Sequence, residues 1–490
     1  MNTNLYSTTV ERWGLFELLL TGPSEGNPYQ DVTLTAQFRH QQRVIRVDGF
    51  YDGNGTYKIR FMPDTEGRWT FEVSSSTPEL QGAVGEFECT PAMAGNHGPV
   101  RVHDELHFTY EDGTVYHPFG TTCYAWTHQD QALQEETLAT LQTSPFNKIR
   151  MCLFPKRYSF NSNEPDYFPF AGSKADGFDL TRFNPEYFAN LEKRIVQLQE
   201  LGIEADLILF HPYDTGHWGF DRMPAETDDF YLRYVIARLS AYRNVWWALA
   251  NEFDFMKEKV LSDWDRFFRI VVERDPYQHL RSLHNGSSMY NPGGITYYDH
   301  TKPWVTHVSM QHWDVTLMKS WRTMYKKPIV VDECCYEGNL PQRWGNISGE
   351  EMTAKFWDCF ARGGYGGHGE TYMHPENIIW WARGGRLYGN CPERLAFMRK
   401  VLDDAPAHLQ PQDSFRDVPT LGVEGKYYLQ YYNNHRPAYR ELPLPEEGCY
   451  RIEIIDTWNM TITALDGEFS GVTGIPMPGK PYMAVRVRAI

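Results

Sequence analysis

The sequence lacks the segments that would direct a protein into or across a membrane. No basic stretch followed by an apolar stretch stands near the first residue, and no apolar run is long enough to cross a bilayer. The eight cysteines are scattered and do not form the dense framework of a small disulfide-bonded domain, which favours free thiols. We therefore expect a cytoplasmic protein with no membrane partner.

Basic residues are scarce relative to acidic ones. The chain carries 47 Lys and Arg against 63 Asp and Glu, which gives a net charge of −16. Because phosphate groups are bound by clustered cations, this deficit argues against a nucleic-acid partner. No solenoid repeat is present, and 490 residues suffice for two or three domains. The composition is compatible with a monomer or a homo-oligomer.

Aromatic residues, in contrast, are abundant. They make up 15% of the chain, with 15 Trp and 30 Tyr. Flat rings stack on the apolar faces of sugars, and Tyr and Trp add a polar tip, so the excess is typical of a carbohydrate-binding protein. A large aromatic core gives the same composition, and composition alone does not separate the two interpretations.

Hydrophobic periodicity divides the chain into three parts. Residues 1–98 contain short segments that alternate apolar and polar residues, such as Thr33–Phe38 and Arg43–Val47, separated by turn signals such as Asp52–Gly55. This pattern predicts an N-terminal β-sandwich. Residues 99–408 alternate strand-like and amphipathic helical segments, and residues 409–490 return to short strands that predict a small antiparallel β-sandwich.

The middle part predicts an α/β fold, a (β/α)₈ or TIM barrel. The eight candidate strands are Tyr116–Thr122, Lys148–Phe154, Glu204–Phe210, Val245–Asn251, Gln278–His284, Trp304–Met310, Pro328–Glu333 and Gly366–Tyr372. The candidate helices are Glu135–Gln142, Asn184–Glu200, Asp228–Arg238, Ser262–Glu273, Asp314–Tyr325, Gly349–Arg362 and Pro392–Leu402, with Ser348 as an N-cap. The connection from Asn285 to Lys302 has no convincing helix. The long loop Pro155–Thr181 is expected to form a wall of the substrate site.

Two of these strands end in carboxylates. Val245–Phe253 is apolar until its last residues, which include Glu252, and Pro328–Glu333 ends in two acidic residues. Because the C-terminal ends of barrel strands surround one mouth, Glu252 and Glu333 are expected to face each other there. Side chains alternate along a strand, so only one of Asp332 and Glu333 points into the mouth, and we assign Glu333. Glycoside hydrolysis requires such a pair of carboxyl groups.

The other strand tips carry polar and aromatic residues that suit a sugar. The expected substrate-binding residues are Trp126, Arg150, His211, Asn251, His284, His312 and Trp381. Further polar residues at the tips are Tyr124, Lys156, Asp214, Gln311 and Glu370. Asn251 is suited to hold a sugar 2-hydroxyl, and Arg150 to keep the nucleophile ionised. An ordinary structural role fits any single histidine about as well.

Several other residues imitate a functional site. Glu337 and Glu370 are the carboxylates most easily mistaken for catalytic ones. His368 and Glu370, with His374, resemble a metal-binding cluster, but their spacing on a strand is loose. We expect neither a metal nor an organic cofactor.

Two motifs carry a family resemblance. Trp247–Glu252 and Ile329–Glu333 resemble the fourth- and seventh-strand motifs of clan A glycoside hydrolases. Phe119–Trp126 and Trp13–Leu18 resemble the apiosidase-like group of glycosidases, which has an N-terminal β-sandwich, a barrel and a C-terminal β domain. The resemblance implies Glu252 as acid/base and Glu333 as nucleophile of a retaining enzyme, with Asn251 on the 2-hydroxyl.

One position departs from the clan pattern. A tyrosine common on the sixth strand is not evident, because Ser309–His312 stands there. The resemblance therefore leaves open what positions Glu333, and it does not name the sugar.

The resulting hypothesis is a retaining, exo-acting glycosidase that cleaves plant- or microbe-derived oligosaccharides. One alternative is an inverting enzyme that uses another base, such as Asp214 or Glu370. A second alternative is a catalytically inactive carbohydrate-binding protein.

Overall fold

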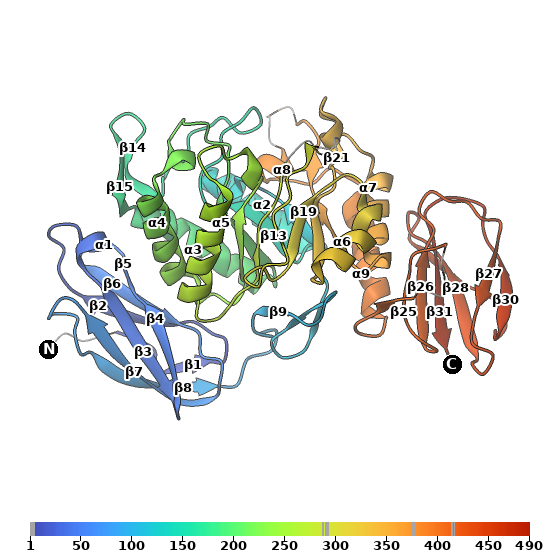
Figure 1. The fold of residues 1–490 in the computed structure, drawn as a ribbon, viewed down its shortest axis with the longest axis horizontal. Helices are drawn as coiled ribbons and strands as arrows, with labels where there is room; N and C mark the ends of the chain where they lie inside the picture. Colours follow the sequence, from blue (N-terminus) through green and yellow to red (C-terminus); the bar gives the residue numbers. More distant parts are fainter. Residues whose placement is uncertain are drawn as a thin grey trace.

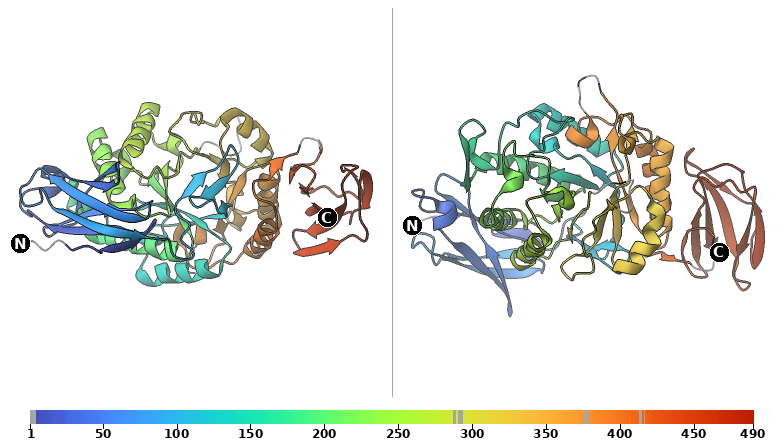
Figure 2. Two further views of the ribbon diagram at one scale, coloured as in Figure 1. Left: turned by 90° about the horizontal axis from the view of Figure 1, so that it is seen from below. Right: turned by 45° about the horizontal axis from the view of Figure 1, so that its top comes forward.

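The computed structural model describes residues 5–286, 289, 294–374, 376, 379–412, 415 and 417–490. Three units follow one another along the chain, with the barrel between two β units at opposite ends of the molecule (Figures 1 and 2). The predicted fold class is confirmed. The predicted domain boundaries fall in the connections between β8 and β9 and between α9 and β24.

The N-terminal unit consists of two facing antiparallel sheets. One has the order β1-β8-β7-β3-β4 and the other β2-β6-β5, with β1 parallel to β8. The strands are β1 Thr9–Glu11, β2 Phe16–Thr21, β3 Leu34–His40, β4 Arg43–Asp48, β5 Phe50–Tyr51, β6 Thr56–Phe61, β7 Gly67–Ser75 and β8 Val84–Thr90, with helix α1 at Pro28–Asp31. Alternate side chains point inward, and Phe38 of one sheet stacks on Phe61 of the other at 4.0 Å between ring centroids.

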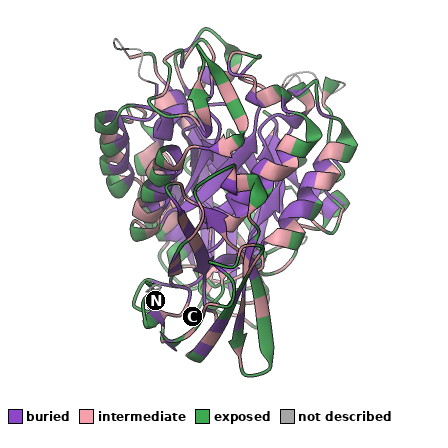
Figure 3. Cartoon of the chain, turned by 90° about the vertical axis from the view of Figure 1, so that its left-hand side faces the viewer, coloured by how far each residue is buried: buried purple, intermediate pink, exposed green. Residues whose placement is uncertain are grey.

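The barrel consists of eight parallel strands. Their order is β18-β17-β16-β13-β12-β22-β20-β19, and a parallel bridge between His284 and Ser309 joins the two ends. The strands are β12 Gly120–Thr122, β13 Lys148–Cys152, β16 Glu204–Phe210, β17 Val245–Ala250, β18 Arg281–Ser282, β19 Val308–Gln311, β20 Ile329–Glu333 and β22 Tyr365–His368. All are buried along their length (Figure 3), which explains why β17 is apolar throughout and why the charged side chains of the other strands need partners inside the barrel.

Seven of the eight barrel strands are shorter than predicted, and the first and the fifth are shortened most. The segment predicted as Tyr116–Thr122 is divided between β12 and the last strand of a small sheet, β9 Val100–Val102, β10 Phe108–Tyr110 and β11 Val115–Tyr116. In the fifth strand, Gln278 has a φ of 53°, and the Asp275 carboxylate accepts hydrogen bonds from His279. The residues before Arg281 therefore form a turn.

Helices surround the barrel close to the predicted positions. They are α2 Gln131–Thr143, α3 Pro185–Glu200, α4 Ala225–Leu239, α5 Leu261–Arg274, α6 Met318–Tyr325, α7 Gly349–Ala361, α8 Trp380–Arg383 and α9 Cys391–Asp403. Ser348 caps α7 as predicted, by accepting a hydrogen bond from the Glu351 N–H. No α-helix occurs among the described residues of 285–302. None of the described helices is long and apolar enough to cross a membrane.

The long loop after β13 contains a hairpin, β14 Phe170–Ser173 and β15 Gly177–Phe183. It packs on the barrel through Phe183, which stacks on Tyr234 of α4 at 3.8 Å between ring centroids. Shorter strands β21 Glu337–Gly338 and β23 Glu370–Thr371 pair beyond the barrel mouth.

The C-terminal unit packs against α7. Its main sheet has the order β24-β25-β26-β31-β28-β29, and β27 pairs with β30. The strands are β24 Gln410–Pro411, β25 Thr420–Val423, β26 Tyr427–Tyr431, β27 Tyr439–Pro443, β28 Tyr450–Asp456, β29 Thr461–Ala464, β30 Val472–Pro476 and β31 Met483–Ala489. Trp357 of α7 stacks on Tyr431 of β26.

A buried ion cluster joins the N-terminal unit to the barrel. Arg60 of β6 donates to both oxygens of Glu192 on α3, at 2.7 and 3.0 Å, and Arg238 of α4 also donates to Glu192. Burial opposes ionisation, but the two guanidinium groups hold the pKa of Glu192 below its ordinary value. The cluster therefore fixes the two units through one shared anion.

We predict that Glu192→Gln lowers the stability of this interface by about 1.5–3 kcal/mol, because two buried guanidinium groups lose their shared anion. The loss is limited because Arg60 keeps Glu17 as a partner and Arg238 keeps Asp52. The change is measured as a shift of the urea unfolding transition. Glu86→Gln, in an exposed pair with Arg68, serves as the control and costs less than about 1 kcal/mol. Equal effects of the two substitutions would contradict this prediction.

Candidate active site

Glu252 lies where the fourth barrel strand stops. β17 ends at Ala250, and the Asn251 N–H donates to the Phe210 carbonyl. Glu252 itself has a φ of 51°, in the left-handed region, at a cost of about 1 kcal/mol or more. A Cβ on Gly286 would come within 2.8 Å of the Glu252 Cβ, so glycine is required beside it. The sequence thus turns this carboxylate out of the strand.

The last two residues of β20 point in different directions. Asp332 forms ion pairs with Lys148 at 2.8 Å and Arg150 at 3.0 Å, beneath the barrel mouth. Glu333 instead contacts Gln311, whose side chain reaches the mouth from the end of β19. The assignment of Glu333 rather than Asp332 to the mouth agrees with this arrangement.

Gln311 connects the two candidate carboxylates. Its Nε2 atom donates to Oε1 of Glu252 and to Oε2 of Glu333, at 2.9 Å in each case. The two oxygens are therefore separated by no more than twice this distance. Both side chains are buried. Glu252 and Glu333 are brought together as expected from the sequence.

Two tyrosine hydroxyls donate hydrogen bonds to the carboxylates. Tyr124 donates to Glu333 and lies 3.1 Å from Oδ1 of Asn251, and Tyr213 donates to Glu252. Tyr213 was absent from the sequence-based candidates. Its place three residues after the end of β16 is the signal that could have identified it.

Arg150 has partners that differ from the expected one. Its guanidinium donates to Oδ1 of Asn251 at 2.9 Å and to Ser309 at 2.9 Å, and it pairs with Asp332. It therefore orients Asn251 and holds the floor of the site, whereas the expectation was that it would keep the nucleophile Glu333 ionised. Asn251 receives hydrogen bonds through its oxygen, which fixes the direction of its amide.

The three predicted histidines occupy different positions. His284 contacts Ser309 through Nδ1 at 2.9 Å and places Nε2 3.5 Å from Oε1 of Glu333, and burial holds its pKa well below the ordinary value. His211 bonds to backbone groups of Phe154 and Tyr213, so it shapes the turn that presents the Tyr213 hydroxyl. His312 accepts a hydrogen bond from the Asp314 N–H. Of the three, His284 lies against a carboxylate.

Trp381 lies at the centre of an aromatic wall, and its ring contacts Tyr124, Tyr158, Phe160, Tyr336 and Trp344 at centroid distances of 4.9–5.8 Å. Tyr158 and Phe160 come from the long loop after β13, as expected for a wall of the site. Trp126, in contrast, is fully buried in the hydrophobic core.

Lys156 is enclosed by rings beside the carboxylates. Its Nζ lies 3.4 Å from the ring centroid of Tyr124, 4.0 Å from Tyr213, 4.6 Å from Tyr158 and 5.3 Å from Trp381. Burial lowers its pKa to about 8. Among the described residues no carboxylate lies within ion-pair distance, so the electron-rich ring faces hold the ammonium. One cation thus contacts both tyrosines that donate to the carboxylates.

Burial dominates the electrostatics of the pair. It raises the pKa of Glu333 to about 8, against the opposing effect of the Tyr336 hydroxyl. It also raises the pKa of Glu252, opposed mainly by the Lys156 charge and the Gln311 hydrogen bond. Because the carboxyl groups share a donor at close range, their apparent pKa values belong to the pair. Near neutral pH the pair retains a proton.

The other candidate carboxylates accept hydrogen bonds from backbone N–H groups. Asp214 accepts from the N–H groups of Trp218 and Phe220, at 2.7 and 2.6 Å. Glu370 accepts from Tyr388 and Gly389, and Glu337 from Asn390 and Cys391, before α9. These hydrogen bonds hold the loops after β16 and before α9 in place.

Glu337, Glu370 and His368 form a buried group whose donor atoms lie within 4.8 Å of one another. This set has the chemistry of a cation site. Both carboxylates, however, already receive backbone N–H groups around the start of α9, where the helix dipole favours anions. The absence of a metal requirement stays a prediction.

The apiosidase-like catalytic domain family matches residues 103–396, more than half of the chain. The chain belongs to this family. Two domain families of unknown function, DUF5060 and DUF5605, match residues 9–76 and 416–488. The resemblance to the apiosidase-like group is thereby confirmed, and this apiosidase-like protein is a glycoside hydrolase.

Solved structures agree with this assignment. A candidate glycoside hydrolase from Bacteroides vulgatus ATCC 8482 is 40% identical, over 99% of this chain and 100% of its own, with a TM-score of 0.94. A glycoside hydrolase family 5 protein from the same organism shares the fold at 15% identity, over 81% of this chain and 95% of its own, with a TM-score of 0.62. No curated protein matches the sequence.

Proposed function

We propose that this apiosidase-like hydrolase cleaves an oligosaccharide with retention of anomeric configuration, through a covalent intermediate on Glu333. The observation that carries the proposal is the bridge from Gln311 to both carboxylates, at 2.9 Å each. Retaining enzymes hold their carboxyl groups about 5–5.5 Å apart, and inverting enzymes about 6.5–9.5 Å apart to admit water. The bridged pair supports the retaining distance.

The roles follow from the partners of each group. Glu252 protonates the leaving oxygen while a carboxylate oxygen of Glu333 attacks the anomeric carbon, and the glycosidic C–O bond breaks. Glu252 then removes a proton from water, which attacks the same carbon and releases Glu333. Hydrogen bonds from Tyr124 and Gln311 stabilise the ionised nucleophile. Asn251, oriented by Arg150, is placed to bind the 2-hydroxyl.

The inverting alternative requires a second base that can reach water. The two candidates are Asp214 and Glu370. In both, the carboxylate oxygens already accept hydrogen bonds from backbone N–H groups. This arrangement favours Glu333 as the partner of Glu252.

Exo action is also part of the proposal. The loop after β13 and the loop after β20 meet through Phe160 and Trp344, at 6.3 Å between ring centroids, and both rings contact Trp381. A wall closed in this way supports a site that takes the end of a saccharide chain rather than its middle.

We predict that Glu333→Gly lowers kcat/KM on an activated aryl glycoside by roughly 10⁴-fold or more. Azide restores turnover, because it occupies the vacated space and attacks the anomeric carbon directly, giving a glycosyl azide of inverted configuration. Glu333→Gln fills that space and serves as the control that azide does not rescue. An azide product of retained configuration would assign Glu333 as the acid/base and contradict the proposed roles.

A second prediction concerns the pH profile. The Lys156 charge favours ionised Glu252, so Lys156→Met raises the pKa of this acid. Since Glu252 must be protonated for the first step, the alkaline limb of kcat/KM moves to higher pH. Lys156→Arg retains the charge and leaves the limb in place. An unchanged limb in Lys156→Met, or a shift to lower pH, would contradict the assignment of Glu252.

A further inference from the structure

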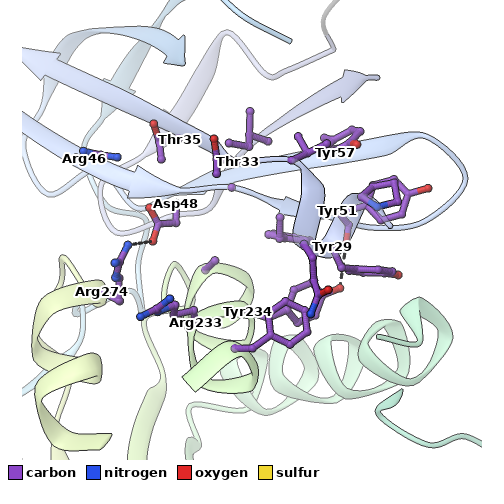
Figure 4. Close-up of a pocket in the computed structure, with 18 residues that line it drawn as sticks. Tyr29, Thr33, Thr35, Arg46, Asp48, Tyr51, Tyr57, Arg233, Tyr234 and Arg274 are labelled. Atoms are coloured by element: carbon purple, nitrogen blue, oxygen red, sulfur yellow. Dashed lines mark hydrogen bonds and ion pairs between the residues drawn. The ribbon is translucent and has the colours of Figure 1, made fainter. Parts of the chain in front are cut away.

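A cavity lies between the N-terminal unit and the barrel helices, and we call it the seam groove. It has a volume of about 550 Å³, within the range of roughly 300–1,000 Å³ typical of ligand sites. Strands β3 and β4 form one side, and helices α4 and α5 form the other (Figure 4). None of the residues around Glu252 and Glu333 lines it. The seam groove is therefore separate from the active site.

Positive charge is concentrated in the seam groove. Its lining contains Arg46, Arg233 and Arg274 but a single acidic residue, Asp48, whereas the whole chain has a net charge of −16. Asp48 pairs with Arg274 at 3.0 Å. The exposed Arg46 and Arg233 form no ion pair with any residue that the structure describes. Two guanidinium groups on opposite sides thus remain available to an anion.

Aromatic rings form the other end of the seam groove. Tyr29 and Phe230 are half-buried and line the cavity. Tyr29 is held by edge contacts to Tyr51 and Tyr234, at 4.9 and 5.8 Å between ring centroids. In Figure 4 Tyr29 and Tyr51 lie on the right, Arg46 and Arg274 lie on the left, and Arg233 lies between them beside Tyr234. Fixed rings of this kind offer surfaces on which a sugar ring can stack at low entropic cost.

We propose that the seam groove binds an acidic oligosaccharide, whose carboxylates pair with Arg46 and Arg233 and whose apolar sugar face stacks on Tyr29. Guanidinium groups bind carboxylates through paired, charge-assisted hydrogen bonds. The rings select a saccharide over a small inorganic anion. The site would hold the hydrolase on a charged polysaccharide while the barrel cleaves a neighbouring chain end. This proposal depends on neither the retaining mechanism nor the assignment of Glu333.

The test is isothermal titration calorimetry of the full chain with tri-galacturonate, cellotriose and inorganic sulfate. The wild type binds tri-galacturonate with a Kd below about 1 mM, and more weakly as salt is added. Arg46→Ala with Arg233→Ala weakens this binding at least 10-fold and leaves kcat/KM on a small aryl glycoside unchanged. The matched control, Arg436→Ala with Arg451→Ala, removes the same charge from exposed positions of the C-terminal unit and leaves binding unchanged.

Three results would overturn the proposal. Equal loss in both double variants would mean that binding depends on net charge alone. Unchanged binding after removal of Arg46 and Arg233 would place the ligand elsewhere. Cellotriose or sulfate bound as tightly as tri-galacturonate would remove the requirement for an acidic sugar. Tyr29→Ala removes the stacking surface. We expect it to weaken the binding of tri-galacturonate and to leave the weak binding of sulfate unchanged.

Discussion

The active site depends on a network of buried charges beneath the barrel mouth. Lys148 pairs with Asp206 and Asp332 at 2.8 Å each, and Arg150 joins Asp332 to Asn251. All of these side chains are almost completely buried. Charges in such a place are stable only when paired, so each member fixes the next. The network therefore provides a rigid floor above which the strand ends hold Glu252 and Glu333.

The two carboxylates above this floor are arranged for chemistry at some cost to stability. Glu252 has a left-handed backbone conformation, and burial raises the pKa of both groups. Gln311 reduces the cost by donating to both, and Tyr124 and Tyr213 donate to one each. The resemblance to clan A led us to expect a tyrosine on the sixth strand, but Gln311 stands there and the tyrosine hydroxyls reach the carboxylates from other loops.

Much of this arrangement could be predicted from local sequence, because the alternation of side chains along a strand and the residue at which the strand ends are both local properties. They identified the barrel and placed Glu252 and Glu333 at its mouth. Contacts between distant loops were less accessible. The donor role of Tyr213 follows from the path of the loop after β16, and that of Gln311 from the meeting of three strand ends at the mouth. The pairing of Arg150 with Asp332 follows from the packing of two strands that are not neighbours in the sequence. The seam groove could not be predicted from the sequence, because it forms only where the N-terminal unit packs on the barrel helices.

The most direct test of the account is proton NMR of the sugar released in the first minutes of hydrolysis. A carboxylate pair bridged by one glutamine amide has the short separation of retaining enzymes, so the expected first product has the anomeric configuration of the substrate. Mutarotation then mixes the anomers on a slower timescale, so the first spectrum is decisive. A first-formed sugar of inverted configuration would contradict the covalent role of Glu333 and the central claim.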